Sequence, residues 1–135
     1  MTVNVVLDGL DALFAKFDRI PDIVKESAKQ ALLRSGDAIG TVSKMECPRG
    51  ATGYLERSFF NEWDEEAIAA VIGYSAEYAI WVHEMLDPTL SGHSVNWTKP
   101  GSKNKFLEDP YNRYKDAIPD YVARAIEQSL AGGLA

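Results

Sequence analysis

The chain has 135 residues, of which 46% are hydrophobic and 25% are charged, and its formal net charge is −6. This composition is typical of a globular protein, and the length fits a single domain over residues 1–135. The acidic balance argues against a protein that grips nucleic-acid phosphates, because that affinity comes largely from Lys and Arg. One cysteine cannot form an internal disulfide, and no apolar run is long enough to cross a membrane.

The first predicted element is a short strand over Thr2–Leu7, a run rich in Val. Asp8 is placed to cap a helix over Gly9–Phe17, whose apolar residues recur at helical spacing. Ile20 and Pro21 break that helix. Pro21 then suits the first turn of the next helix, where its missing N–H costs nothing.

A long helix is predicted over about Asp22–Ser43, because small and apolar residues recur on one of its faces. This stripe consists of Val24, Ala28, Ala31, Leu32, Ser35, Ile39 and Val42. Gly36 and Gly40 lie four residues apart on the helix, and each costs up to about 1 kcal/mol relative to Ala. The two glycines indicate either close approach by another element or a loosened last turn.

A β-hairpin is predicted in the middle of the chain, after a loop over Cys47–Gly53 that Pro and Gly keep irregular. Tyr54–Phe60 suits a pleated strand, and Trp63–Glu66 is polar enough for a turn. The apolar run Ala67–Tyr74 suits a buried second strand, and Ser75–Glu77 can open a short helix after it. Because an isolated hairpin is marginal, we expect helices to cover one of its faces.

A polar loop with Pro and Gly follows over about 85–102, and it is long for a compact domain. Loops of this length are usually functional or flexible. Trp97 either anchors a partner surface or folds back onto the core. We count Trp97 and His93 as candidate interface residues.

The last quarter of the chain, from Lys103, is predicted to be helical. Its apolar side includes Phe106, Leu107, Tyr111, Tyr114, Ile118, Val122 and Ile126. Pro119 must kink this helix or divide it after about Ala117. Gly132 and Gly133 should end it, and the tail over 131–135 is expected to fray.

These elements predict an α+β fold in one domain. A small antiparallel sheet would pack against the long helix of the N-terminal half and against the C-terminal helix. We find no internal repeat and no low-complexity segment that would suggest another architecture.

Catalytic and metal-binding patterns are incomplete. His83-Glu84 lacks the second His, four residues on, that a zinc-protease helix needs, and position 87 is Asp. His83, Glu84, Asp87 and His93 share no spacing that fixes a metal geometry. We therefore expect no metal and no cofactor.

Other reactive patterns are no stronger. Gly50-Ala51-Thr52-Gly53 has the spacing of a nucleic-acid-clamping loop, but its surroundings are acidic and a strand is predicted next, so a turn fits better. Neither Ser58 nor Ser94 lies in a nucleophile elbow. We expect a protein that is not an enzyme.

The charge is concentrated in the middle of the chain, where residues 47–90 carry two arginines against eight acidic side chains. The densest part is a run of candidate interface residues, namely Glu62, Asp64, Glu65 and Glu66. Such a run is either a solvated face, or a surface that repels DNA or meets a basic partner. Arg57 is one of the two arginines, and it pairs with a carboxylate either within the fold or across a subunit boundary.

Four segments in a fixed order resemble a known family. They are Thr52-Gly53-x-Leu55-x-Arg57-Ser58, Val71-Ile72-Gly73, Tyr78-Ala79-Ile80-Trp81-Val82-His83-Glu84 and Lys105-Phe106-Leu107-Glu108-x-Pro110. Together they look like the head–tail joining and tail-completion proteins of tailed bacteriophages, small neck proteins sometimes described as minor tail or capsid components. The resemblance covers nearly the whole chain.

The resemblance implies a structural virion protein, made in the bacterial cytoplasm and built into the phage neck. It would form a homo-oligomeric ring around the DNA channel, with connector and tail proteins as neighbours, and DNA would pass without sequence-specific binding. The subunit alone could be a monomer. A tail terminator, a minor capsid protein and a non-virion prophage accessory or regulatory protein are the alternatives.

Overall fold

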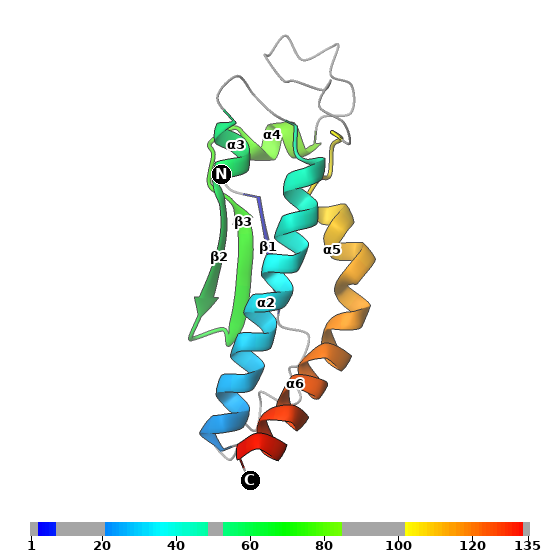
Figure 1. Ribbon diagram of the computed structural model, residues 1–135. Coiled ribbons are helices and arrows are strands. Elements are labelled where there is room, and N and C mark those ends of the chain that lie inside the picture. The colour runs from blue at the N-terminus through cyan, green and yellow to red at the C-terminus, as the bar shows by residue number, and fades with distance from the viewer. Residues whose placement is uncertain (1–2, 8–20, 49–52, 85–101, 134–135) are drawn as a thin grey trace.

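The computed structural model describes residues 3–7, 21–48, 53–84 and 102–133. Its central element is α2 (Asp22–Glu46), with a three-stranded antiparallel sheet on one side and the C-terminal helices on the other (Figure 1). The strands are β1 (Val3–Leu7), β2 (Phe59–Asp64) and β3 (Ala69–Tyr74). This architecture confirms the predicted α+β class and the long helix.

β3 is the middle strand of the sheet, and the strand order is β1-β3-β2. Val5 of β1 and Asn61 of β2 both lie opposite Ile72 of β3. The strand predicted at Thr2–Leu7 is therefore confirmed over Val3–Leu7, and it adds a third strand to the predicted hairpin. Within the described part of the chain, both outer strands are edges of the sheet.

Side chains alternate between the two faces of the sheet, as the pleat requires. The face toward α2 carries Val3, Val5, Leu7, Phe59, Asn61, Trp63, Ala70, Ile72 and Tyr74. Tyr74 is fully buried in this layer, where its hydroxyl lies 2.7 Å from the Ser43 hydroxyl of α2. Its ring packs edge-on against Phe59 and Phe106, with centroids 5.5 and 5.1 Å away.

Gly36 and Gly40 of α2 allow the sheet to approach closely. A Cβ atom at Gly36 would lie 2.8 Å from Ile72 Cγ2, and one at Gly40 would lie 2.2 Å from Phe59 Cζ. α2 continues without a break to Glu46. Close approach is therefore the correct reading of the two glycines, and the loosened last turn is wrong.

The C-terminal helical run is divided as Pro119 predicted. It consists of α5 (Glu108–Tyr114), a 3-10 turn η3 (Lys115–Ala117) and α6 (Ile118–Gly133). Pro119 lies in the first turn of α6, where its missing N–H needs no partner. α6 ends at Gly133, as Gly132 and Gly133 predicted.

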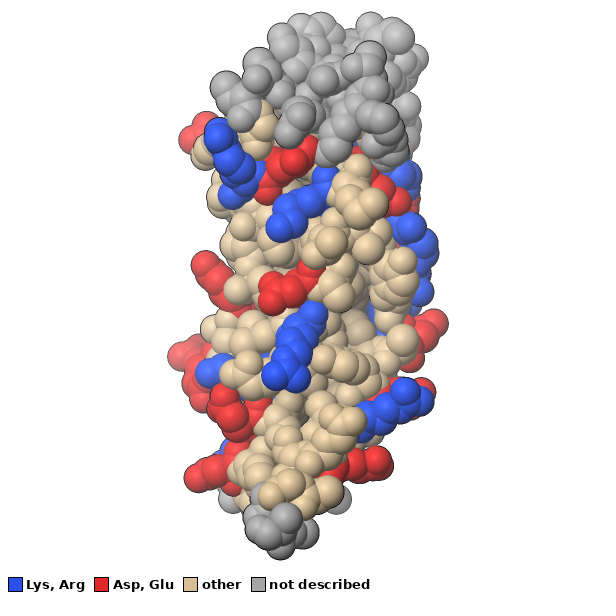
Figure 2. Space-filling view, viewed as in Figure 1, with Lys and Arg blue, Asp and Glu red and all other residues tan. Residues whose placement is uncertain are grey.

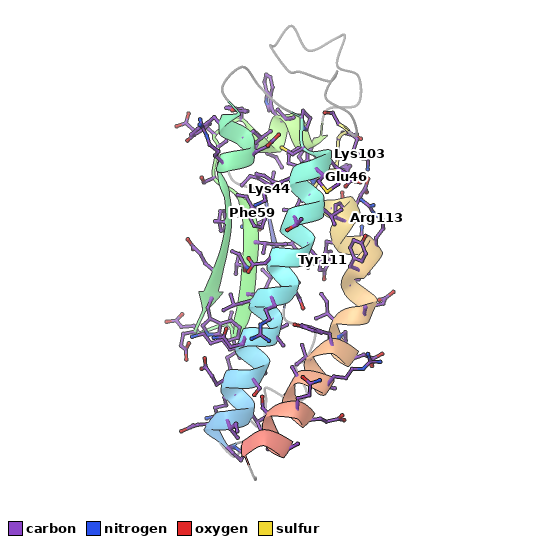
Figure 3. The ribbon with its side chains drawn as sticks, in the orientation of Figure 1. Lys44, Glu46, Phe59, Lys103, Tyr111 and Arg113 are labelled. Carbon is purple, nitrogen blue, oxygen red and sulfur yellow. The ribbon has the colours of Figure 1, made fainter. Side chains whose placement is uncertain are left out.

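An ion pair joins α5 to the end of α2 (Figure 3). Arg113 Nη2 lies 2.6 Å from Glu46 Oε2, and the Lys103 N–H donates to the Glu46 carbonyl at 3.0 Å. The last turn of α2 is thereby tied to both ends of the segment 103–113.

The predicted strand at Tyr54–Phe60 is wrong in its first half. Tyr54–Arg57 forms a short helix, α3, after Gly53 has entered the left-handed region at φ 69°. The Ser58 hydroxyl donates to the Leu55 carbonyl at 2.8 Å and ends this turn. The strand starts only at Phe59, so it takes in Trp63 and Asp64, which were predicted to turn.

The short helix predicted after the hairpin is confirmed as α4 (Ala79–Glu84). The predicted helix over 9–17 and the predicted loop over 85–102 lie outside the described residues, apart from Ser102. Cys47 is buried. Among the described helices, none has the length and apolarity to span a membrane.

Candidate assembly surfaces

The four acidic candidate residues meet at the β2–β3 hairpin. Asp64 Oδ1 accepts hydrogen bonds from the backbone N–H groups of Glu66 and Ala67, both at 3.1 Å, and Glu65 Oε2 accepts one from Trp63 Nε1 at 2.7 Å. The turn also holds Ile68 at φ 51°, which is unusual for a β-branched residue. The backbone of the turn is therefore fixed, and Glu62 and Glu66 remain free to face solvent or a partner.

The acidic hairpin lies at the lower end of the sheet in Figure 1, and the first turns of α2 extend beyond it. Red atoms gather along the lower left margin in Figure 2, the side on which the hairpin lies in Figure 1. Glu62, Asp64, Glu65 and Glu66 are all exposed. Their exposure fits a solvated face as well as a surface that repels DNA or meets a basic partner.

The opposite end of the sheet carries exposed aromatic side chains. Tyr54 of α3 is 49% exposed, Tyr78 is 43% exposed and Trp81 of α4 is 55% exposed. The Tyr54 and Tyr78 rings are in contact, with centroids 6.3 Å apart. We call these three residues the aromatic end.

Partial burial raises the pKa of Tyr78, and the neighbouring Tyr54 adds to this shift while Arg57 opposes it. Arg57 is exposed on α3, which places it beside the aromatic end. The ion pairs formed between described residues do not include Arg57, so the predicted intramolecular pair is not formed within that part of the chain.

Sequence reasoning missed the aromatic end. The spacing of Tyr78 and Trp81 could have shown that they share a helical face. Their union with Tyr54 depends on the short helix α3, which was predicted as a strand.

His83 is a buried connector between α4 and α5. Its Nδ1 lies 3.0 Å from Glu84 Oε1, and its Nε2 accepts the Glu108 backbone N–H at 3.2 Å. These bonds are satisfied by a neutral ring with its proton on Nδ1. Lys105 forms ion pairs with Glu84 and Glu108, and its hydrogen bond to Glu84 is the main reason that the pKa of this carboxyl is lowered.

No group of metal-ligating side chains occurs among the described residues. Glu84 lies beside His83, whereas Asp87 and His93 of the weak metal pattern lie outside the described residues. The candidate interface residues His93 and Trp97 also lie outside the described residues. The contacts of His83 fit a structural role, because its ring is bonded through one nitrogen to Glu84 of α4 and through the other to Glu108 of α5.

Hollows on the described surface lie on both sides of the core, and two of them bear on the argument below. One, of about 460 Å³, lies between α2 and α6 and is lined by Arg34, Ser35, Ala38, Ile39, Val42, Tyr114, Ala117, Ile118 and Tyr121. The other, of about 500 Å³, runs beside β1 and is bounded by Ile80 of α4 and by Tyr111 and Asn112 of α5.

Comparison with known proteins gives no relative: no family model, curated protein or solved structure matches the chain.

Proposed function

We propose that the protein is a structural subunit of a tailed-bacteriophage neck. It acts as a head–tail joining or tail-completion protein and assembles as a ring around the DNA channel. The observation that carries this proposal is the chemical difference between its two ends: an acidic hairpin at one end of the sheet and an aromatic end at the other.

The aromatic end fits a docking surface for a second protein. Tyr and Trp are enriched among the residues that dominate protein–protein binding energy, because they bury a large area at a small cost in conformational entropy. Arg57 lies beside them, and Arg is enriched at interfaces for its planar hydrogen-bonding group. A neighbouring connector or tail protein is the partner that this surface would meet.

The acidic hairpin fits a surface past which DNA moves without binding. Like charge repels the phosphates, and at physiological salt the effect extends over about 8 Å. Hydrogen bonds hold the backbone of the turn and the carboxylates of Asp64 and Glu65 in place. The ring would then guide DNA by repulsion, with no sequence-specific contact.

The experiment is deletion of the gene from the phage or prophage that carries it, followed by electron microscopy of the lysate. We expect DNA-filled heads beside separate, complete-looking tails, and restoration of joined particles by the wild-type gene supplied in trans. Joined, infectious particles in the deletion lysate would contradict the proposal. Empty heads would favour the minor capsid alternative, and tails of abnormal length would favour the tail terminator.

Matched variants then separate the two ends. Tyr54→Ala with Trp81→Ala should reduce particle joining, while Glu65→Gln with Glu66→Gln should leave joining intact and slow DNA delivery. Joining that is equally efficient in the aromatic variant would remove the docking role from that end.

A further inference from the structure

Among the described residues, no strand pairs with the outer edge of β2. The Ser75 N–H donates to the Ser58 carbonyl at 3.0 Å, which fixes the phase of the ladder between β2 and β3. Since hydrogen-bonded and non-hydrogen-bonded pairs alternate along antiparallel strands, Phe59, Asn61 and Trp63 direct their N–H and C=O groups away from β3. No described element lies beyond this edge (Figure 1).

Contacts with α2 hold β2 in place. Asn61 Nδ2 donates to the Leu33 carbonyl at 2.7 Å and to Asp37 Oδ1 at 2.9 Å, which fixes the middle of the strand to α2. Lys44 Nζ lies 5.0 Å from the Phe59 ring centroid at one end of the strand (Figure 3). An edge fixed in this way requires little further ordering when another strand joins it.

The charges on β2 limit which strand of a second copy can pair with its outer edge. Two β2 edges paired with each other would bring Glu62 and Asp64 of one copy close to the same carboxylates of the other, and like charges across strands are destabilising. β1 (Val3–Leu7) has no charged residue. It is the other edge of the described sheet. The hollow of about 500 Å³ alongside it is also lined by Glu84 and Glu108, whose carboxylates are both paired with Lys105.

We propose that β2 of one copy adds to β1 of the next copy, in parallel, with Asn61 opposite Val5. Because Val5 pairs with Ile72 of β3 through hydrogen bonds, Asn4 and Val6 direct their backbone groups outward. In this register the Asn61 N–H reaches the Asn4 carbonyl, and the Val6 N–H reaches the Asn61 carbonyl. The pattern of a parallel ladder is thereby satisfied on both strands.

In this register, residues that lie opposite each other across the new interface are on the same face of the joined sheet. Asn61 and Val5 both face the helix side, while Glu62 and Val6 both face the open side. Glu62 then lies next to an uncharged residue. Because the two surfaces in contact differ, the interface is head-to-tail and repeats around a ring if the rotation closes.

This inference deepens the proposed ring and rests on self-association, which can be tested without a phage. The first measurement is sedimentation velocity of the full chain over a concentration series reaching about 1 mM. The wild type is expected to self-associate. A wild type that stays monomeric throughout would overturn the pairing.

The decisive variant is Val6→Pro, with Val6→Ala as its matched control. Proline removes the outward N–H and is tolerated on an edge strand, whereas alanine keeps the N–H. We expect Val6→Pro to be monomeric and Val6→Ala to assemble, with thermal unfolding showing that both are folded. Assembly of folded Val6→Pro equal to that of the control would overturn the inference and leave the neck function standing.

A second test does not depend on whether Val6→Pro folds. In the variant Val6→Cys with Glu62→Cys, the two cysteines of one chain are separated by β3, at about two strand spacings or 9.5 Å, which is too far for a disulfide. Any disulfide between them therefore joins two copies. We expect a ladder of linked oligomers under mild oxidation, and none from Lys115→Cys with Gln128→Cys; the same yield from both pairs would overturn the pairing.

Joined particles in the gene-deletion lysate, together with this ladder, would refute the neck function while leaving the strand pairing intact.

Discussion

The two sides of α2 are packed in different ways. Toward the sheet, Gly36 and Gly40 bring the helix so close that an added Cβ would overlap side chains of β2 and β3. Toward α6, the same helix leaves a largely apolar hollow of about 460 Å³ beside Ala38, Ile39 and Val42. Both contacts are made by one helix of 25 residues.

The difference shows where the fold specifies its geometry. The sheet side is fixed by shape, since only glycine fits, and by the Asn61 and Tyr74 hydrogen bonds. On the α6 side, the hollow leaves room beside the helix. This side should therefore tolerate changes in side-chain volume. Substitutions on the two sides should therefore differ in size and in sign.

The largest effect is expected from Gly40→Ala. Its Cβ would lie 2.2 Å from the Phe59 ring, which is itself held against Tyr74, so the ring or the helix must shift. Overpacking of this kind costs about 1–3 kcal/mol. The measurement is the free energy of unfolding by urea.

The control for that substitution is Gly132→Ala in α6, where nothing lies within 4 Å of the added Cβ. There alanine should stabilise by up to about 1 kcal/mol, because it is the better helix former. Equal effects at Gly40 and Gly132 would show that helix propensity, and not close packing, determines both.

The next effect concerns alkaline pH. Burial raises the pKa of Tyr74 well above its ordinary value, with the Cys47 thiol nearby adding to the shift and the Ser43 hydrogen bond opposing it. The unfolded state therefore loses this proton first, at a pKa of about 10. The contribution of Tyr74 to the free energy of unfolding is therefore fully present below pH 10. Above pH 10 the free energy of unfolding falls by up to about 1.4 kcal/mol per pH unit.

The measurement is the free energy of unfolding from pH 8 to pH 11.5 for the wild type and for Tyr74→Phe. The variant should lose stability less steeply above pH 10, because phenylalanine has no proton to release. Parallel curves for the two proteins would mean that Tyr74 does not control the alkaline limit.

At neutral pH, Tyr74→Phe should cost about 1 kcal/mol, the usual net contribution of one hydrogen bond. It removes the 2.7 Å contact with Ser43 and leaves that buried hydroxyl without its partner across the interface. The double substitution Tyr74→Phe with Ser43→Ala should cost less than the sum of the two single changes. Strict additivity would indicate that the hydroxyls do not stabilise each other.

The sheet side of α2 was predictable from sequence, and the reason is local. The buried residues Ala28 and Leu32 repeat with helical period, and the two glycines that continue this row pointed either to a close neighbour or to a loosened last turn. The prediction of helix division at Pro119 also depended on chain stereochemistry alone.

Features that join distant segments were not predictable in the same way. Tyr54–Arg57 has residues that suit a strand, but the left-handed Gly53 redirects the chain into a helical turn. The His83 ring depends on the Glu108 N–H, 25 residues away in the chain. The acidic hairpin was predictable because its four charges lie close together in the sequence, whereas the aromatic end was missed because α3 had to be known first.

The smallest effect is expected on the α6 side, from Ala38→Leu. Ala38 lies at the rim of the hollow, so a leucine there can cover Ile39 and Val42 without displacing a packed side chain. Each methylene that is fully buried is worth about 0.8 kcal/mol, and the open rim buries only part of the added side chain. We therefore expect a gain below about 1 kcal/mol in the free energy of unfolding. Ala123→Leu, at an exposed position of α6, is the matched control and should change stability very little. A loss at position 38 as large as that of Gly40→Ala would show that α2 is packed as closely toward α6 as toward the sheet.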